Sequence, residues 1–271
     1  MLADDQYVDV DRGRLRYRDE GHGEAVVFVH GWTLDLDIWE PQATELRRIF
    51  RVIRFDRRGF GRSSGCPSLI DDADDLLTLL DRLELSQVAV VGMSQGARVA
   101  LHAALISPRR ISGLVLDGSP HLGAEPETGA DEDLPLDRYR ELVRTAGIDA
   151  FRREWQDHSF LKLVTDDLRA HQLLARVIAR YPGRDLAESQ PPLVRIPDAR
   201  SVARVQKPTL ILNGEFDTDS RKRAGDALHA ALPFAERALV PKAGHLANLD
   251  NPPAYNGLVR EFLQRQFRAA A

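Results

Sequence analysis

Short runs of apolar residues recur along this chain, and each is followed by glycine or aspartate and then by a stretch with helical spacing. Runs of this kind are typical of strands buried on both faces of a sheet, because a strand with one wet face alternates apolar and polar residues. The runs lie at residues 25–29, 52–55, 88–91, 114–116, 210–212 and 238–240. Buried strands that alternate with helices predict an α/β domain with a mostly parallel sheet flanked by helices.

The N-terminal part of the chain has a different pattern, with apolar and polar residues alternating over 7–10 and again over 15–18. Arg12-Gly13 lies between these stretches, so they are predicted to form a β-hairpin. The hairpin and the six buried runs together make an eight-stranded sheet. With 271 residues, 43% of them hydrophobic, the chain is long enough to bury the core of one such domain.

The segment from residue 120 to residue 200 interrupts the alternation of strands and helices. It contains no convincing buried strand, and its helical stretches are 138–145 and 166–180. The strand–helix pattern resumes at Pro208. We therefore expect an α/β core made of residues 1–119 and 201–271, with residues 120–200 inserted after the sixth strand as a helical lid (cap).

Another expected helix, at 70–83, begins with four aspartates at 71, 72, 74 and 75. Negative charge is favoured in the first turn of a helix, so we expect these side chains to be solvated. A metal site is the alternative for this acidic group. The chain has no paired-cysteine or H-E-x-x-H zinc pattern and no calcium loop, so we expect no metal and no cofactor.

Charge and cysteine usage exclude several classes of protein. The formal net charge is -4, with basic and acidic residues interspersed, whereas a nucleic-acid-binding protein needs a basic stripe. No apolar run approaches the ~18 residues of a membrane span, and the first residues lack the pattern of a secretion signal. The single cysteine, Cys66, allows no intrachain disulfide. This suits a reducing compartment, and we expect a cytoplasmic protein.

The pentapeptide Gly92-Met93-Ser94-Gln95-Gly96 has the form G-x-S-x-G and lies between the buried run 88–91 and a helical stretch. Strand, tight turn and helix in this order form the nucleophile elbow, in which a strained turn projects the serine hydroxyl above the sheet. The glycines allow the strand and helix to approach closely. The alternative is a glycine-rich helix start with an N-cap serine. The context favours Ser94 as a nucleophile.

A serine nucleophile requires a base, and the base requires an acid that fixes its tautomer. His245 directly follows the last predicted strand, at the sheet edge where ligands bind in α/β proteins. Asp217 follows the run 210–212, so it lies at the same edge. The order serine, aspartate, histidine is that of α/β hydrolases. Asp219 and Asp117 remain alternatives for the acid.

The reaction of a serine nucleophile also requires donors for the oxyanion of the tetrahedral intermediate. One predicted donor is the backbone N–H of Gln95, the residue after the nucleophile. The other is expected in the loop after the run 25–29, which begins His30-Gly31-Trp32. Glycine permits a tight turn there, so we predict that the backbone N–H of Trp32 is the second donor.

These motifs together resemble those of the α/β-hydrolase superfamily over nearly the whole chain. The pieces that carry the resemblance are Val29-His30-Gly31-Trp32, Asp56-Arg57-Arg58-Gly59-Phe60-Gly61-Arg62-Ser63, the Ser94 pentapeptide, Gly214-Glu215-Phe216-Asp217 and Ala243-Gly244-His245-Leu246-Ala247-Asn248-Leu249-Asp250. Within the superfamily the chain is most similar to the 3-oxoadipate enol-lactonases and to the cofactor-free haloperoxidase/esterase group. The resemblance implies a cofactor-independent enzyme with the catalytic triad Ser94, Asp217 and His245. Haloalkane dehalogenases and epoxide hydrolases differ because they have aspartate where this chain has Ser94.

The expected activity is hydrolysis of a small-molecule carboxylic ester or lactone through an acyl-enzyme. Phe151, Trp155 and Phe160 of the lid are expected to supply apolar walls that bind the substrate. Packing inside a helical subdomain is the alternative role for each of them. Other functions open to the same triad are hydrolysis of a carbon–carbon bond next to a carbonyl and acyl transfer to another acceptor. A non-catalytic ligand receptor is a further alternative, although a receptor has no need of all three residues.

Overall fold

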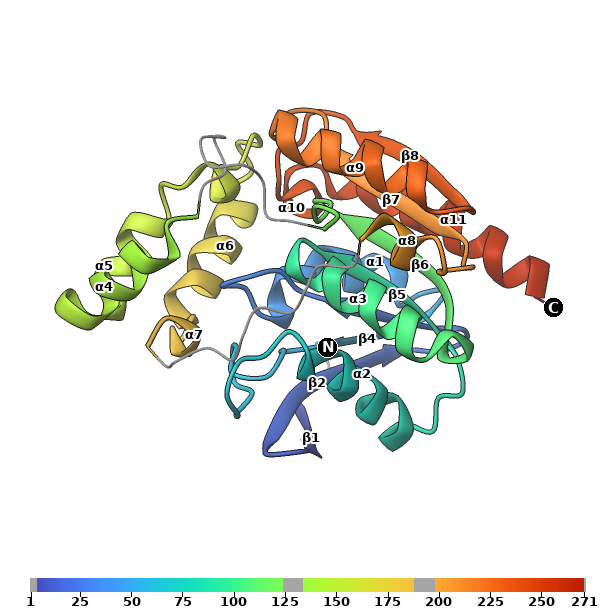
Figure 1. Cartoon of the computed structure of the whole chain (residues 1–271), viewed down its shortest axis with the longest axis horizontal. Coiled ribbons are helices and arrows are strands. Elements are labelled where there is room, and N and C mark those ends of the chain that lie inside the picture. Colours follow the sequence, from blue (N-terminus) through green and yellow to red (C-terminus); the bar gives the residue numbers. More distant parts are fainter. Residues whose placement is uncertain (1–3, 124–133, 188–197, 271) are drawn as a thin grey trace.

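The structure is a computed structural model, and it describes residues 4–123, 134–187 and 198–270. Its eight strands form one sheet in the order β1-β2-β4-β3-β5-β6-β7-β8 (Figure 1). The strands are β1 (Gln6–Val10), β2 (Gly13–Gly21), β3 (Ala25–Val29), β4 (Arg51–Phe55), β5 (Val88–Met93), β6 (Ile111–Asp117), β7 (Thr209–Gly214) and β8 (Ala235–Val240). Strand β2 is antiparallel to both of its neighbours, β1 and β4, and all other neighbouring pairs are parallel. The mostly parallel eight-stranded sheet is therefore confirmed, and so is the N-terminal hairpin.

Alternate side chains of the central strands enter two separate hydrophobic cores. Val26 and Phe28 of β3 belong to one core, and Val27 and Val29 belong to the other. The first core includes residues of α1 and α11, and the second includes residues of α2, α3, α8 and α9. The helices of the α/β core are α1 (Glu40–Leu46), α2 (Asp71–Arg82), α3 (Gln95–Ile106), α8 (Ala199–Val202), α9 (Asp219–Ala231), α10 (Ala247–Asp250) and α11 (Pro252–Ala270), with 3-10 turns η1 (Leu36–Trp39) and η2 (Pro108–Arg110). Helices thus cover both faces of the sheet, because its strands are apolar on both faces.

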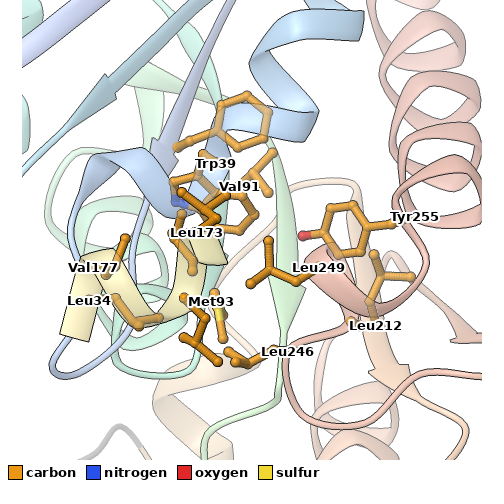
Figure 2. Packing of buried hydrophobic residues seen from close by; sticks show 14 of the residues in the cluster. Leu34, Trp39, Val91, Met93, Leu173, Val177, Leu212, Leu246, Leu249 and Tyr255 are labelled. Carbon is orange, nitrogen blue, oxygen red and sulfur yellow. The ribbon is translucent and has the colours of Figure 1, made fainter. Parts of the chain in front are cut away.

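Between β6 and β7 the chain leaves the sheet and forms a group of helices beside it (Figure 1). These are α4 (Leu136–Ala146), α5 (Ile148–Trp155), α6 (Leu168–Arg180) and α7 (Arg184–Ala187), with the 3-10 turn η3 (Ser159–Leu161). We keep the name lid for residues 120–200, of which 124–133 and 188–197 lie outside the described residues. Leu173 and Val177 of α6 belong to the same hydrophobic cluster as Leu34 and Met93 of the α/β core (Figure 2).

Helix α11 is the longest helix and packs Val259, Phe262 and Leu263 into the first core. Its amphipathic pattern is typical of a helix that covers one face of a sheet. Neither α11 nor any other helix within the described ranges combines the length and the apolar character needed to cross a bilayer.

The acidic start of α2 differs from the expectation that its aspartates are solvated. Asp72 and Asp75 are buried, and they pair with Arg57 at 2.7 Å and with Arg58 at 2.6 Å. The expectation was wrong for these two aspartates because their guanidinium partners come from the loop after β4, which helix periodicity does not reveal, whereas Asp74 is exposed as expected. A buried carboxylate is tolerated when it is paired and hydrogen-bonded. No group of three potential metal ligands occurs among the described residues.

Candidate active site

Ser94 connects β5 to α3 and has φ 52° and ψ -113°. These angles are unfavourable for a residue with a side chain, so the turn is held by its surroundings. The Ser94 N–H donates to the Asp117 carbonyl of the neighbouring strand at 2.8 Å. Helix α3 then begins at Gln95. The strand, strained turn and helix expected at this motif are all present.

The glycines on either side of Ser94 are required by close approaches of backbone. A Cβ atom on Gly92 would lie 2.3 Å from the Gly96 carbonyl oxygen. A Cβ atom on Gly96 would lie 2.1 Å from the carbonyl oxygen of Val29 in the adjacent strand. Both distances are far below van der Waals contact, so the turn places α3 directly against the ends of the strands.

His245 lies in the loop between β8 and α10, and its imidazole contacts the Asp217 carboxylate. The distance from His245 Nδ1 to Asp217 Oδ1 is 3.1 Å, and both residues are buried. Burial raises the pKa of Asp217, but His245 and the hydrogen bonds from Asn213 and Thr218 outweigh it, so the pKa is lowered. An ionised Asp217 accepts the Nδ1 proton of His245, which leaves Nε2 as the basic nitrogen.

The turn formed by Asp117 and Gly118 at the end of β6 lies next to both Ser94 and His245. Its Asp117 carbonyl accepts the Ser94 N–H. Gly118 has φ 57°, and a Cβ atom there would lie 2.8 Å from Cε1 of His245. The serine and the Asp217–His245 pair therefore flank the same two-residue turn at the carboxyl end of the sheet.

The two alternative acids lie in different surroundings from Asp217. Asp219 is in the first turn of α9, where its exposed side chain pairs with Lys222 at 3.0 Å. The Asp117 side chain is fully buried, and neither of its carboxyl oxygens has a hydrogen-bond partner by distance and angle among the described residues. Burial and the nearby Asp217 raise the pKa of Asp117 well above its usual value. Of the three candidate acids, Asp217 is the one whose carboxylate contacts the His245 imidazole, so the geometry favours Asp217.

The loop after β3 brings the predicted donor Trp32 next to the serine. A Cβ atom on Gly31 would lie 3.4 Å from the Cβ of Ser94, so the peptide between Gly31 and Trp32 borders the nucleophile. His30 holds the start of this loop: its Nε2 accepts the Arg57 N–H at 2.9 Å, and its Nδ1 lies 2.8 Å from the Gly31 carbonyl. Burial and the Arg57 charge lower the pKa of His30 to about 3, so His30 is neutral and has a structural role.

The second predicted donor, Gln95, is the first residue of α3, where backbone N–H groups have no partner within the helix. Its side chain is held by a buried polar chain. Arg57 donates to the Gln95 Oε1 at 3.1 Å and to Asp72 at 2.8 Å. These hydrogen bonds explain why Arg57, in the loop after β4, is buried.

The three aromatic residues expected to bind substrate occupy different places in the lid. The Phe160 ring lies 4.5 Å from the ring of His245, so it borders the reacting groups. Trp155 is buried, and its ring centroid lies 4.9 Å from that of Trp32 and 4.3 Å from that of His158. Phe151 is fully buried and packs against the rings of Trp32, Tyr139, Trp155 and Tyr181.

Two residues near the site were not singled out from the sequence for a role of their own. Asp250 accepts backbone N–H groups from Gly244, at 2.7 Å, and from Val164 and Thr165, at 2.6 and 3.1 Å. It thereby joins the histidine loop to the lid. Thr33 has φ 62°, a conformation that is rare for a β-branched residue. The lid partners of Asp250 are 85 and 86 residues away in the sequence, and the lid partner of Thr33, Trp155, is 122 residues away, so no local pattern identifies these roles.

Comparison with known proteins gives matches over nearly the whole chain. The family model described as alpha/beta hydrolase fold matches residues 24–252. A curated relative from Pseudomonas putida, 2-hydroxy-6-oxononadienedioate/2-hydroxy-6-oxononatrienedioate hydrolase 2, is 29% identical, with 93% of this chain and 92% of the relative covered. A thermophilic esterase from Thermogutta terrifontis has a TM-score of 0.79 and 28% identity, covering 96% of this chain and 99% of that one. Est816, described as an N-acyl homoserine lactone degrading enzyme, has a TM-score of 0.74 and 25% identity, covering 95% and 100%.

Proposed function

Because this chain belongs to the α/β-hydrolase fold family, we propose that it hydrolyses a small carboxylic ester or lactone with the triad Ser94, His245 and Asp217. The observation that carries this proposal is the strained turn at Ser94 beside the 3.1 Å contact between His245 and Asp217. The esterase and the lactone-degrading enzyme among the similar structures support the substrate class. In this proposal residues 120–200 act as a lid over the site, and Phe160 lines it.

In the proposed mechanism the Ser94 Oγ attacks the carbonyl carbon while Nε2 of His245 takes the hydroxyl proton. The oxyanion that forms is bound by the backbone N–H groups of Trp32 and Gln95. Collapse of the intermediate releases the alkoxide, which receives the proton from His245 and leaves an acyl group on Ser94. Water then attacks the acyl group with His245 again as the base, which releases the acid and restores the hydroxyl. Asp217 orients the imidazole and stabilises its charged form throughout.

The mechanism draws only on side chains and backbone groups of this chain. Its acyl donor is a small molecule, and no nucleic acid or membrane takes part. We place the enzyme in the cytoplasm, which its single cysteine supports.

The first test is hydrolysis of p-nitrophenyl acetate and butyrate by the wild type and by Ser94→Ala. We expect clear turnover by the wild type and a loss of about 10³-fold or more in kcat for the variant, because acyl transfer has no other nucleophile. Ser86→Ala, at an exposed loop position at the opposite end of β5 from Ser94 and outside any proposed role, is the matched control and should keep wild-type activity. A folded wild type without turnover, or an active Ser94→Ala, would contradict the esterase proposal.

Carbon–carbon bond hydrolysis is the second candidate, because the Pseudomonas putida relative is named for a 2-hydroxy-6-oxo dienedioate substrate. The same triad can serve when the leaving group is a stabilised carbanion instead of an alkoxide. Product analysis with a vinylogous dione separates the two candidates. Release of two fragments from the dione, with poor turnover of the p-nitrophenyl esters, would favour the second candidate.

A further inference from the structure

Side chains of the lid hold the loop after β3, which contains the proposed oxyanion donor Trp32. The indole N–H of Trp155, at the end of α5, donates to Thr33 Oγ1 at 2.8 Å. Arg180, at the end of α6, pairs with Asp35 at 2.8 Å. Two consecutive helices of the lid therefore reach the same short loop. The contact with Thr33 lies closer to the proposed chemistry, since Thr33 directly follows Trp32.

The hydrogen bonds at Thr33 have a fixed direction. An indole N–H can only donate, so the Thr33 hydroxyl accepts from Trp155. Its single hydrogen then points to the Trp32 carbonyl oxygen, which lies 2.7 Å from Thr33 Oγ1. The result is a chain of donors from the Trp155 indole through the Thr33 hydroxyl to the carbonyl of Trp32. Thr33 is fully buried and Trp155 is 2% exposed, so bulk water does not compete for these groups.

The backbone conformation of Thr33 explains why these hydrogen bonds are needed. Its φ of 62° lies in the left-handed region, which a β-branched side chain disfavours. A strained residue of this kind persists only where its neighbours fix it. If Thr33 relaxed toward negative φ, the preceding peptides would rotate, and the Trp32 N–H would move away from the position beside Ser94.

We propose that Trp155 and Thr33 are positioning residues for the oxyanion hole, and that the lid fixes the Trp32 backbone through the hydrogen bond from the Trp155 indole to the Thr33 hydroxyl. This inference rests on the proposed serine-hydrolase function. It differs from the substrate-wall role expected for Trp155, because the indole N–H is used within the protein and the ring is buried.

The test compares three single variants and one double variant in p-nitrophenyl butyrate hydrolysis. Thr33→Val removes the hydroxyl with almost no change of volume, and Trp155→Phe removes the indole N–H together with part of the ring. For each we expect kcat to fall about 10- to 100-fold, with KM changed less than about threefold. Thr33→Ser keeps the hydroxyl and should retain kcat within about threefold of the wild type. The double variant Trp155→Phe/Thr33→Val should have a kcat little lower than that of the less active single variant, because both substitutions remove the same hydrogen bond.

Trp39→Phe is the matched control for the loss of an indole. Trp39 is fully buried like Trp155, but its N–H has no hydrogen-bond partner among the described residues. We expect its kcat to stay near that of the wild type. Thermal unfolding of each variant shows whether a lost activity reflects lost structure. If Trp155→Phe does not fold, the contrast between Thr33→Val and Thr33→Ser decides the question.

The outcomes separate this inference from the function on which it rests. A wild type that does not hydrolyse the esters overturns the proposed function, and the inference with it. An active wild type overturns the inference alone if Trp155→Phe and Thr33→Val keep full kcat, or if they only raise KM. Equal losses in Thr33→Ser and Thr33→Val would also overturn it, because a packing role does not distinguish a hydroxyl from a methyl group.

Discussion

At the scale of single residues, two buried aspartates near the same histidine have opposite electrostatic surroundings. The Asp217 carboxylate accepts hydrogen bonds from Asn213, at 3.0 Å, and Thr218, at 2.9 Å, besides its contact with His245. These interactions outweigh burial and lower its pKa. Asp117 is fully buried, and burial together with the nearby Asp217 outweighs the Gly118 N–H and the Tyr255 hydroxyl, so its pKa is raised well above the usual value. The balance between burial and the neighbouring charges and donors thus differs between the two carboxyl groups.

We therefore predict that Asp217→Asn lowers kcat for p-nitrophenyl esters by about 10⁴-fold, because the amide favours the wrong imidazole tautomer. Asp219→Asn is the control, because it makes the same substitution at an exposed side chain. Its kcat should stay within about twofold of the wild-type value, as expected for a surface substitution. Asp117→Asn should also keep activity, since Asp217 rather than Asp117 holds the His245 imidazole. Steady-state kinetics of the three variants checks this assignment, and a large loss in Asp117→Asn with full activity in Asp217→Asn would reverse it.

At the scale of helices and strands, the sequence patterns predicted most of the architecture. Apolar runs identified the strands, because a strand buried on both faces has no polar positions. The Ser94 motif also predicted the turn between β5 and α3, because its residues are contiguous in the sequence. Features that depend on distant partners were not predictable: Asp72 and Asp75 are buried because Arg57 and Arg58 reach them from another loop. The hydrogen bond between Trp155 and Thr33 likewise joins residues 122 positions apart.

Gly214, the last residue of β7, shows how closely elements approach at the site. A Cβ atom there would lie 2.1 Å from the Gly244 carbonyl oxygen, in the loop that carries His245. We predict that Gly214→Ala lowers the free energy of unfolding by about 3 kcal/mol, because backbone atoms cannot move aside cheaply. Urea unfolding followed by circular dichroism measures the change.

The matched control is Gly257→Ala in the interior of α11, where a Cβ atom would meet nothing within 4 Å. This substitution should raise the free energy of unfolding by roughly 0.5–1 kcal/mol, through the lower helix propensity of glycine. Equal effects of the two substitutions would show that the close approach at Gly214 is not maintained in solution.

At the scale of the whole molecule, the lid is bonded to the α/β core at several places. On one side Arg180 of α6 pairs with Asp35 and Asp37, at 2.8 and 2.7 Å. On the other side Asp250 accepts the N–H groups of lid residues Val164 and Thr165. The first contact contains a group that titrates near neutral pH. Burial and the neighbouring Asp56 raise the pKa of Asp35 to about 7, although Arg180 opposes this.

The sign of the resulting pH dependence follows from this raised pKa. Asp35 holds its proton more tightly in the folded state, so its contribution to stability is present below pH 4 and is lost as the pH rises through 7. Arg180 limits that loss because it stabilises the ionised form. We predict that Arg180→Gln lowers the free energy of unfolding more at pH 8.5 than at pH 5.5, by about 1.4 kcal/mol for each unit by which the pKa of Asp35 rises.

Urea unfolding at the two pH values tests this prediction. Arg176→Gln, which removes an exposed arginine from the same helix, is the control and should show no pH-dependent difference from the wild type. A loss in Arg180→Gln that is the same at both pH values would mean that Asp37, rather than Asp35, accounts for the contact.

The bonds between lid and core also bear on how new specificities arise in such a chain. If the inserted segment contacted only the substrate, it could be exchanged between homologues as a unit. The exchange would then change substrate selectivity and keep kcat. Here Trp155 and Arg180 are anchored on the loop that follows β3, and Val164 is anchored on Asp250. A chimera that receives a foreign insert would keep its folded sheet but lose catalytic competence, unless the graft also brings equivalents of these anchors. Recombination between homologues is therefore constrained to exchange the insert and its docking residues together.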